Sequence, residues 1–287
     1  LCKHGIEVKL DLPGVGQNLQ DHPTVLVKYA CTKSMAIHRA LHPVNLAMAG
    51  TKWLFTRRGP AASVFWEAGG LIRSSHKMDY PDIEIQFGPA GFNFLKNNGI
   101  SLDQAFTVHV DQSRPTSVGH IELRSANPAD KPKMFFNYLE TEDDRQRLIQ
   151  GIRRTREIIA QKAFDPYRGE EIYPGPDLTT DAELLNYIKA NVSTDYHPSC
   201  TCRMGMDADA VVDEEMRVHG INGLRVVDAS TMPRITSANL NAPTLMIAAR
   251  AADFILGRPQ LEPFKANFHF MENASNFEKT MVGNKKN

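Results

Sequence analysis

The sequence has no excess of charge of either sign, because its 287 residues include 33 Lys and Arg and 33 Asp and Glu. A general nucleic-acid binder needs surplus cations to displace the counterions of the phosphates, so the balance argues against a nucleic-acid partner. Cysteine is also scarce. Four cysteines are too few and too scattered for a disulfide scaffold: Cys2, Cys31, Cys200 and Cys202.

Long apolar runs are missing as well, and none approaches the roughly 18–20 residues of a membrane-spanning helix. The best candidate, residues 242–256, is interrupted by Arg250 and Asp253, so we expect a buried helix there. The chain starts with Leu rather than Met, and no signal or transit segment is visible at its start. We therefore expect the C-terminal part of a longer protein.

The charged and hydrophobic fractions, 23% and 42%, are typical of a folded globular chain. Strands are predicted wherever apolar and polar residues alternate. These segments are residues 5–12, 83–87, 107–110 and 120–124. Residues 224–230 are expected to form a short buried strand that ends in an acidic residue, and such strands end at ligand crevices in open α/β sheets.

Two helix starts are marked by their caps. Thr141 precedes three acidic residues and a helix with the apolar face Leu148, Ile152 and Ile159. Thr180 and Glu183 form a capping box ahead of a second helix.

Three short segments carry most of the chemical information. In residues 11–23, two closely spaced glycines would let the backbone approach a ligand. Residues 196–205 read Tyr-His-Pro-Ser-Cys-Thr-Cys-Arg-Met-Gly. Residues 239–244 read Asn-Leu-Asn-Ala-Pro-Thr at the start of the last apolar run, where a proline suits the first helical turn. The positive end of that helix dipole suits an oxygen of a ligand.

Together with Val-Val-Asp-Ala-Ser at residues 226–230, these segments resemble the glucose–methanol–choline (GMC) flavoprotein oxidoreductases, in the order found in that family. The resemblance runs from the first residue to about residue 257. Four further segments are similar to the members that oxidise choline: residues 67–73, 117–128, 167–175 and 197–205. The last of them is close to the animal mitochondrial form.

The resemblance implies FAD as cofactor and a fold of the α/β plus α+β class. The chain would hold the C-terminal part of an FAD-binding Rossmann-like domain with an inserted substrate domain of antiparallel sheet and helices. The expected divisions are an FAD-domain segment at 1–24, the substrate-binding domain at 25–190, a second FAD-domain segment with the catalytic residues at 191–258, and a polar tail at 259–287.

The resemblance also implies residue roles. His197 would be the base that takes the hydroxyl proton, since imidazole accepts a proton near neutral pH. Asn241 would orient the substrate oxygen. Glu67 would hold a trimethylammonium group, beside Trp66, and Arg114 stands where a choline-oxidising relative carries a histidine. The residues expected at the flavin are Gly16, Asn18, Asp21, Asp228, Ala229, Asn239 and Pro243.

Each role has a structural alternative. Glu67 can be a carboxylate at a strand end, Asp228 can cap the segment that follows it, and His22 is as easily a structural histidine. His197 with Cys200 and Cys202 could be mistaken for metal ligands, but a single Cys-x-Cys lacks the paired spacing of a zinc site, so no metal is expected.

The expected function is oxidation of choline to betaine aldehyde, with electrons passed to a respiratory acceptor. A mitochondrial location, with peripheral association at the inner membrane, follows from the resemblance alone. Two alternatives remain. The chain can belong to another alcohol dehydrogenase or oxidase of the family, or it can be an inactive fragment, because the Gly-x-Gly-x-x-Gly loop for the FAD pyrophosphate is absent from it.

Overall fold

The structure is a computed structural model that describes residues 1–34, 42–63, 66, 68–94, 100–262 and 264. Glu67 and residues 265–287 lie outside the described residues. The internal contacts divide the chain into two units. Unit 1 comprises Leu1–His22, Arg114–Glu140 and Tyr196–Asn287, and unit 2 comprises Pro23–Ser113 and Thr141–Asp195.

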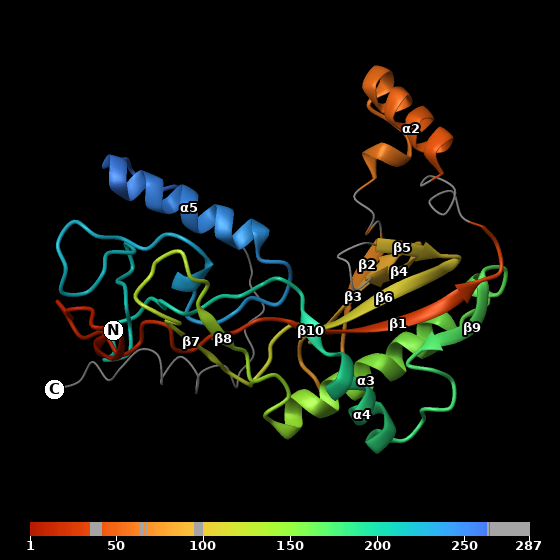
Figure 1. The fold of residues 1–287 in the computed structure, drawn as a ribbon, viewed down its shortest axis with the longest axis horizontal. Helices are drawn as coiled ribbons and strands as arrows, with labels where there is room; N and C mark the ends of the chain where they lie inside the picture. The colour runs from red at the N-terminus through yellow and green to blue at the C-terminus, as the bar shows by residue number, and fades with distance from the viewer. Residues whose placement is uncertain (35–41, 64–65, 67, 95–99, 263, 265–287) are drawn as a thin grey trace. The chain divides into compact units, whose positions relative to one another are not determined.

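Unit 2 is built on an antiparallel sheet of six strands (Figure 1). Its strands are β1 (Pro23–Cys31), β2 (Ala68–Ile72), β3 (Ile83–Gly88), β6 (Ala105–Gln112), β9 (Arg168–Tyr173) and β10 (Ser193–Thr194). Their order is β10-β1-β6-β3-β2, and β9 also pairs with β1. A separate hairpin joins β4 (Gly91–Phe94) to β5 (Ile100–Asp103). The mixed α/β architecture with an antiparallel sheet agrees with the expected fold class.

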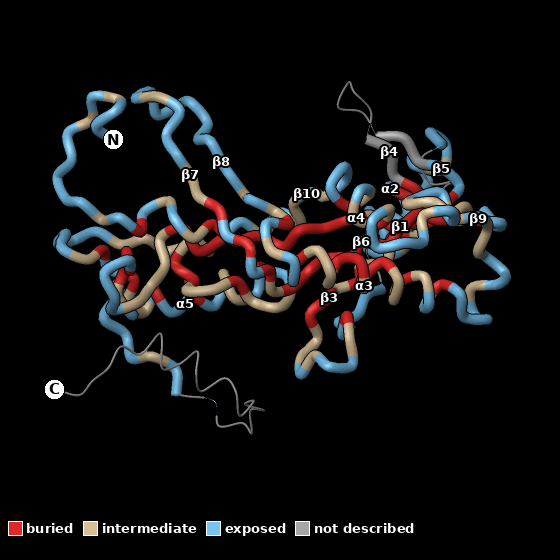
Figure 2. The backbone as a smooth tube through the Cα atoms, turned by 90° about the horizontal axis from the view of Figure 1, so that it is seen from below, coloured by how far each residue is buried: buried red, intermediate tan, exposed pale blue. Residues whose placement is uncertain are grey.

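One face of this sheet is apolar and is covered by α3 (Glu142–Ile159). The register places Val25 opposite Val110 and Val27 opposite Val108, and side chains of alternate residues share a face. Gly151 lets α3 approach closely, since a Cβ added there would lie 2.7 Å from Cγ1 of Val110. Figure 2 shows the buried backbone running along β1, β6 and α3.

The two predicted helix starts are confirmed. The hydroxyl of Thr141 accepts from the backbone N–H of Asp144, and the apolar face of α3 is buried. Thr180 and Glu183 form the capping box of α4 (Asp181–Asn191). The remaining elements of unit 2 are α2 (Pro43–Thr56), η2 (Pro60–Ala62) and η3 (Lys162–Phe164).

Unit 1 has little regular structure. It contains η1 (Cys2–His4), the hairpin of β7 (His120–Glu122) and β8 (Lys133–Phe135), η4 (Ala229–Thr231) and α5 (Asn241–Leu256). Isolated bridges pair Leu19 with Gly119 and Gln20 with Ser199. Its largest core cluster contains Cys200, Met216, Met232, Ile235, Leu240, Ile247 and Ala251.

Two predicted strands are wrong. Residues 5–12 form an irregular, mostly exposed segment, and residues 224–230 form a single isolated bridge, between Arg225 and Arg217, before η4. A local pattern of alternating or apolar residues is compatible with a strand but does not form one by itself. A neighbouring strand must supply the backbone hydrogen bonds. Within the described residues, no strand pairs with residues 5–12, and residues 224–226 share only the hydrogen bonds of that one bridge with residues 216–218.

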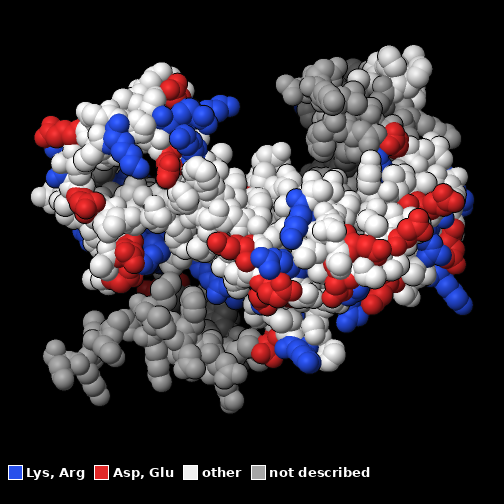
Figure 3. Space-filling view, turned by 60° about the horizontal axis from the view of Figure 1, so that its bottom comes forward, with Lys and Arg blue, Asp and Glu red and all other residues white. Residues whose placement is uncertain are grey.

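The helix predicted at residues 242–256 is present, but its predicted burial is wrong. Only Ile247 and Ala251 of α5 are buried, whereas Leu245, Met246 and Ile255 are exposed. No helix among the described residues is long and apolar enough to cross a membrane. Acidic and basic side chains are interspersed over the face drawn in Figure 3.

Candidate functional site

The segment before β1 organises unit 1 through its backbone. Gly16 has a φ of 79°, donates to the carbonyl of Thr201 at 2.8 Å and accepts from the N–H of Ile121 at 2.6 Å. A Cβ on Gly16 would lie 2.7 Å from the carbonyl oxygen of Ile121. The glycine therefore permits both a left-handed turn and a close backbone approach.

Asn18 and Gln20 extend these connections with their side chains. Asn18 has a φ of 60° and accepts from Nε2 of Gln20 at 2.9 Å. Oε1 of Gln20 accepts from the backbone N–H of Ile235 at 3.2 Å. A cavity of about 380 Å³ opens beside them, lined by Asn18, Gln20, Pro115, Thr116, Val118, Arg203, Pro233 and Arg234.

The carboxylate of Asp21 binds three donors from three segments. Oδ1 accepts from the backbone N–H groups of His22 at 2.9 Å and of His197 at 2.8 Å. The hydroxyl of Tyr138 donates to Oδ2. Asp21 is buried, so these charge-assisted bonds satisfy its charge and hold the backbone of His197 in place.

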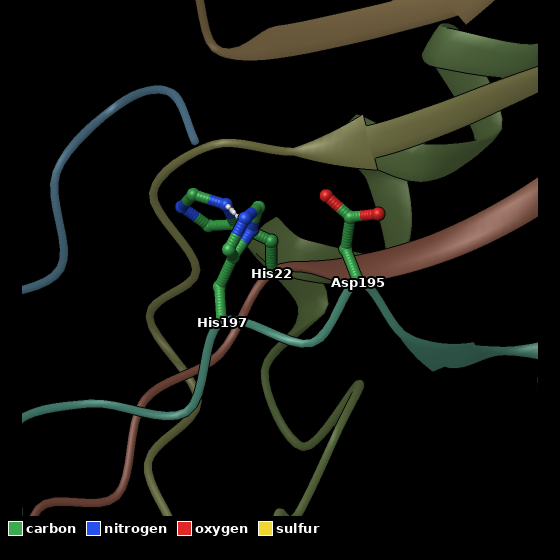
Figure 4. Close-up of side chains that lie close together, drawn as sticks. All are labelled: His22, Asp195 and His197. Carbon is green, nitrogen blue, oxygen red and sulfur yellow. Dashed lines mark hydrogen bonds between the residues drawn. The ribbon is translucent and has the colours of Figure 1, made fainter. Parts of the chain in front are cut away.

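His22 and His197 meet through their rings (Figure 4). Nδ1 of His22 lies 3.1 Å from Nδ1 of His197, and Nε2 of His22 lies 2.9 Å from the carbonyl oxygen of Thr236. A carbonyl only accepts, so Nε2 of His22 carries that ring's proton and Nδ1 of a neutral His22 is an acceptor. His197 must then donate from Nδ1, which leaves the lone pair of a neutral His197 on Nε2.

His22 is fully buried, whereas the side chain of His197 is partly exposed. The buried ring thus fixes the tautomer and orientation of the accessible ring. This is how a general base is prepared, because its acceptor nitrogen must be defined before a proton can move.

Arg114 binds the same loop, at residues 236–237, that His22 contacts. Its Nε donates to Oγ of Ser237 at 2.5 Å, one residue beyond the Thr236 carbonyl that His22 contacts. Arg114 and His22 therefore bind adjacent residues of one loop within unit 1.

The start of α5 carries the predicted Asn241 and Pro243. Asn241 is the first helical residue and is exposed, as is Asn239 before it. Leu240 occupies the cap position without a side-chain cap, so the first-turn N–H groups have no partner within the helix. This end of α5 offers donors and a positive dipole to a ligand.

Asp228 is the cap of η4, where its side chain accepts from the N–H of Ser230 at 2.8 Å. The carbonyl of Ala229 accepts from the N–H of Cys200 at 3.2 Å. The Cys200 thiol is buried, and burial raises its pKa to about 11, so it is a protonated thiol at neutral pH.

In unit 2, the face of the sheet opposite α3 is polar. Alternation along β6 puts His109 and Asp111 on this face and Val108 and Val110 on the other. The Trp66 ring packs edge-on against His109, with centroids 4.4 Å apart at 68°. Trp66 is thereby fixed at the polar face, next in sequence to Glu67.

The amide of Gln86 bridges two carboxylates on this face. Its Nε2 donates to Asp111 at 3.1 Å and to Asp195 at 3.2 Å. Burial, followed by the charge of Asp195, raises the pKa of Asp111 well above its usual range. Burial lowers the pKa of His109, which favours its neutral form.

Comparisons with known proteins show what the chain is similar to. A family model described as GMC oxidoreductase matches residues 115–248. The chain is 48% identical over 264 residues to an oxygen-dependent choline dehydrogenase of Pseudomonas fluorescens, covering 92% of this chain and 46% of that protein. One from Vibrio vulnificus is also 48% identical, over 266 residues, covering 92% and 47%.

Residues 115–248 match the GMC oxidoreductase family, and the likeness to choline dehydrogenases extends over 264 residues of the chain. The chain spans about half the length of the curated relatives it matches. Among solved structures, pyridoxine 4-oxidase from Mesorbium loti aligns with a TM-score of 0.73 at 27% identity, over 90% of this chain and 46% of that one. An Aspergillus oryzae formate oxidase studied for modification of its FAD gives 0.80 at 26%, over 90% and 50%.

The predicted residues fall into four groups. One of them, at η4 and the start of α5, comprises Asp228, Ala229, Asn239, Asn241 and Pro243. In unit 1, His197 contacts His22 and Arg114 binds Ser237. Gly16, Asn18 and Asp21 belong to the segment before His22, and Asp21 binds the backbone of His197. Trp66 lies on the polar face of unit 2. Glu67 lies outside the described residues.

Sequence reasoning missed residues that arrange two separate polar clusters, one in each unit. Tyr138 and Gln86 act through hydrogen bonds from distant segments, which no local pattern reveals. The pair His109 and Asp111 had a usable signal, because polar residues alternate with valines in a buried strand. Buried polar side chains need hydrogen-bond partners. A row of them along one face of a buried strand therefore indicates that other polar groups, functional or structural, lie against that face.

Proposed function

We propose that this chain is part of an FAD-dependent enzyme that oxidises choline to betaine aldehyde. The observation that carries the proposal is the His22–His197 pair, whose hydrogen bonds leave a lone pair on Nε2 of His197. The names of the similar proteins, oxygen-dependent choline dehydrogenases, support the substrate.

The residues present fit one part of the cofactor. FAD, when bound, accepts the hydride from the alcohol carbon. The uncapped start of α5 supplies N–H donors suited to a carbonyl oxygen of the flavin ring. Residues proposed to hold the flavin are Gly16, Asn18, Asp21, Asp228, Ala229, Asn239 and Pro243. The sequence contains no Gly-x-Gly-x-x-Gly loop, so this chain offers no such cradle for the pyrophosphate.

We assign the other steps of the reaction to residues of this chain. Nε2 of His197 takes the hydroxyl proton, and Asp21 and His22 hold that ring in position. The Asn241 amide orients the substrate oxygen and cannot itself be the base. Glu67 and Trp66 bind the trimethylammonium group, which has no N–H to donate and so responds to negative charge and aromatic faces. Arg114 is proposed to contact the substrate as well.

The electron acceptor and the location are further parts of the proposal. A respiratory acceptor is proposed, although the relatives above are named as oxygen-dependent. Oxygen uptake measured against turnover with a quinone distinguishes the two acceptors. The mitochondrial, inner-membrane location stays a prediction from the segment 197–205, since those relatives are bacterial.

The test is steady-state oxidation by the full-length protein that contains this chain, with choline and with the neutral isostere 3,3-dimethylbutan-1-ol. We expect choline to be preferred, and Glu67→Gln to abolish that preference while the flavin content is retained. If the wild type prefers the neutral alcohol, the enzyme is another GMC alcohol dehydrogenase or oxidase. If Glu67→Gln leaves the preference unchanged, Glu67 does not recognise the cation.

A further inference from the structure

Three side chains that can ligate a metal come together on the polar face of the sheet in unit 2. One ring nitrogen of His109, one carboxylate oxygen of Asp111 and one of Asp195 lie within 4.8 Å of one another. His109 and Asp111 belong to β6, and Asp195 follows β10. Imidazole nitrogen and carboxylate oxygen are both ligands of Zn²⁺, which often binds three protein ligands and a water.

Asp111 supplies a second, independent observation. Its side chain is fully buried. Oδ2 accepts a hydrogen bond from the amide of Gln86, whereas Oδ1 is buried and accepts no hydrogen bond from the described residues. Buried polar atoms nearly always have a partner, and a carboxylate oxygen without a donor is costly to bury. A cation bound at Oδ1 would remove that cost.

Gln86 holds the two carboxylates in an arrangement that suits a shared ion. It lies opposite His109 in the pairing of β3 with β6. Its Nε2 donates to Oδ2 of Asp111 at 3.1 Å and to Oδ2 of Asp195 at 3.2 Å. Hydrogen bonds of this kind orient the ligating carboxylates of metal sites. They also leave Oδ1 of Asp111 for the ion.

We propose that His109, Asp111 and Asp195 bind Zn²⁺. The ion would accept a lone pair from the imidazole and from each carboxylate, and its charge would compensate the two aspartates that Gln86 brings together. The edge-on contact with Trp66 restricts rotation of the His109 ring. Because the ligands come from β6 and from the residue after β10, bound zinc would cross-link unit 2.

Other ways of satisfying these groups make different predictions. Mg²⁺ and Ca²⁺ prefer six or more oxygen ligands and do not favour an imidazole nitrogen, so they fit the three side chains less well. A proton shared by Asp111 and Asp195 is the other alternative, since a protonated carboxyl group can donate a hydrogen bond. A pair that holds only a proton would take up no zinc.

The test is calorimetric titration of the purified full chain with Zn²⁺ after treatment with a chelator. We expect about one equivalent to bind and the melting temperature to rise, because an ion that binds the folded state stabilises it. Asp111→Asn and His109→Gln should each raise the dissociation constant about tenfold or more. Circular dichroism verifies that both variants remain folded.

The matched control is His197→Gln, which removes a partly exposed histidine of unit 1 and should leave the zinc affinity unchanged. Titration with Co²⁺ reports the ligand type, because a cysteine thiolate adds an intense charge-transfer band in the near ultraviolet that nitrogen and oxygen ligands lack. The proposal is overturned if the wild type shows no saturable zinc binding or if His197→Gln loses as much affinity as Asp111→Asn. It is also overturned if both ligand variants bind zinc like the wild type, or if the thiolate band appears.

Discussion

At the scale of single residues, the histidine pair defines what the site can do. The carbonyl of Thr236 sets the tautomer of His22, and His22 sets that of His197. One carboxylate, Asp21, holds the backbone of both. The proposed base is therefore positioned by residues that do not themselves need to touch a substrate.

His197→Gln should lower turnover of the full-length protein by about 10²–10⁴-fold, the usual contribution of a general base. The amide keeps a polar group in place but accepts no proton. Turnover should recover partly at high pH, where hydroxide in solution assists. Flavin absorbance, which should be retained, separates loss of the base from loss of the cofactor; unchanged turnover would remove His197 from the mechanism.

His22→Asn tests positioning rather than chemistry. We expect turnover to fall by a smaller factor than in His197→Gln, and its pH profile to shift, because the Nδ1 contact no longer selects the His197 tautomer. A variant that loses only thermal stability, with an unmoved pH profile, would show that His22 is a packing residue.

Asp111 makes a pH-dependent contribution to stability. Its pKa is raised in the folded state, so folding favours the protonated form. The associated stabilisation is present below the unfolded pKa and is lost as the pH rises through the folded pKa. Asp111→Asn, neutral at every pH, should therefore raise the melting temperature relative to wild type at pH 8 more than at pH 5. Thermal unfolding at both pH values checks the sign, and an equal shift at both would contradict it.

At the scale of elements, the sequence predicts best where the signal is local. The caps at Thr141 and Thr180 need only three neighbouring residues, and both are as predicted. Strand pairing and burial depend on distant partners. This is why residues 5–12 and 224–230 were mistaken for strands and why the apolar α5 was wrongly expected to be buried.

Substitution by alanine should change stability in opposite directions at two glycines that lie in helices. At Gly151 in α3, an added Cβ would lie 2.7 Å from the stiff Val110 side chain, so Gly151→Ala should cost about 1–3 kcal/mol. At Gly50 in α2, nothing lies within 4 Å, so Gly50→Ala should gain up to about 1 kcal/mol of local helix stability. Urea unfolding and helical circular dichroism compare them; equal effects would mean that α3 is not tightly packed.

At the scale of the whole molecule, the site could be predicted only in part. The prediction of His197 rests on the motif 196–205, which lies within the residues matched by the family model. The cluster of Gln86, Asp111 and Asp195 comes from three separate segments of unit 2. Its assembly depends on sheet register, which no short motif encodes.

The chain by itself should bind no stoichiometric FAD and should not oxidise choline. It spans about half of its relatives, and it lacks the glycine-rich loop that cradles a dinucleotide pyrophosphate. Flavin absorbance and turnover of the purified chain measure this directly, with the full-length protein as control. Stoichiometric FAD in the isolated chain would show that the flavin site is complete without that loop.

The outward apolar side of α5 also affects how the chain behaves in concentrated solution. The helix exposes four large apolar side chains to water: Leu245, Met246, Ile255 and Leu256. Contacts between such surfaces grow with concentration, whatever the stability of the fold. Solubility, and not unfolding, should therefore set the upper concentration at which this chain can be purified and stored.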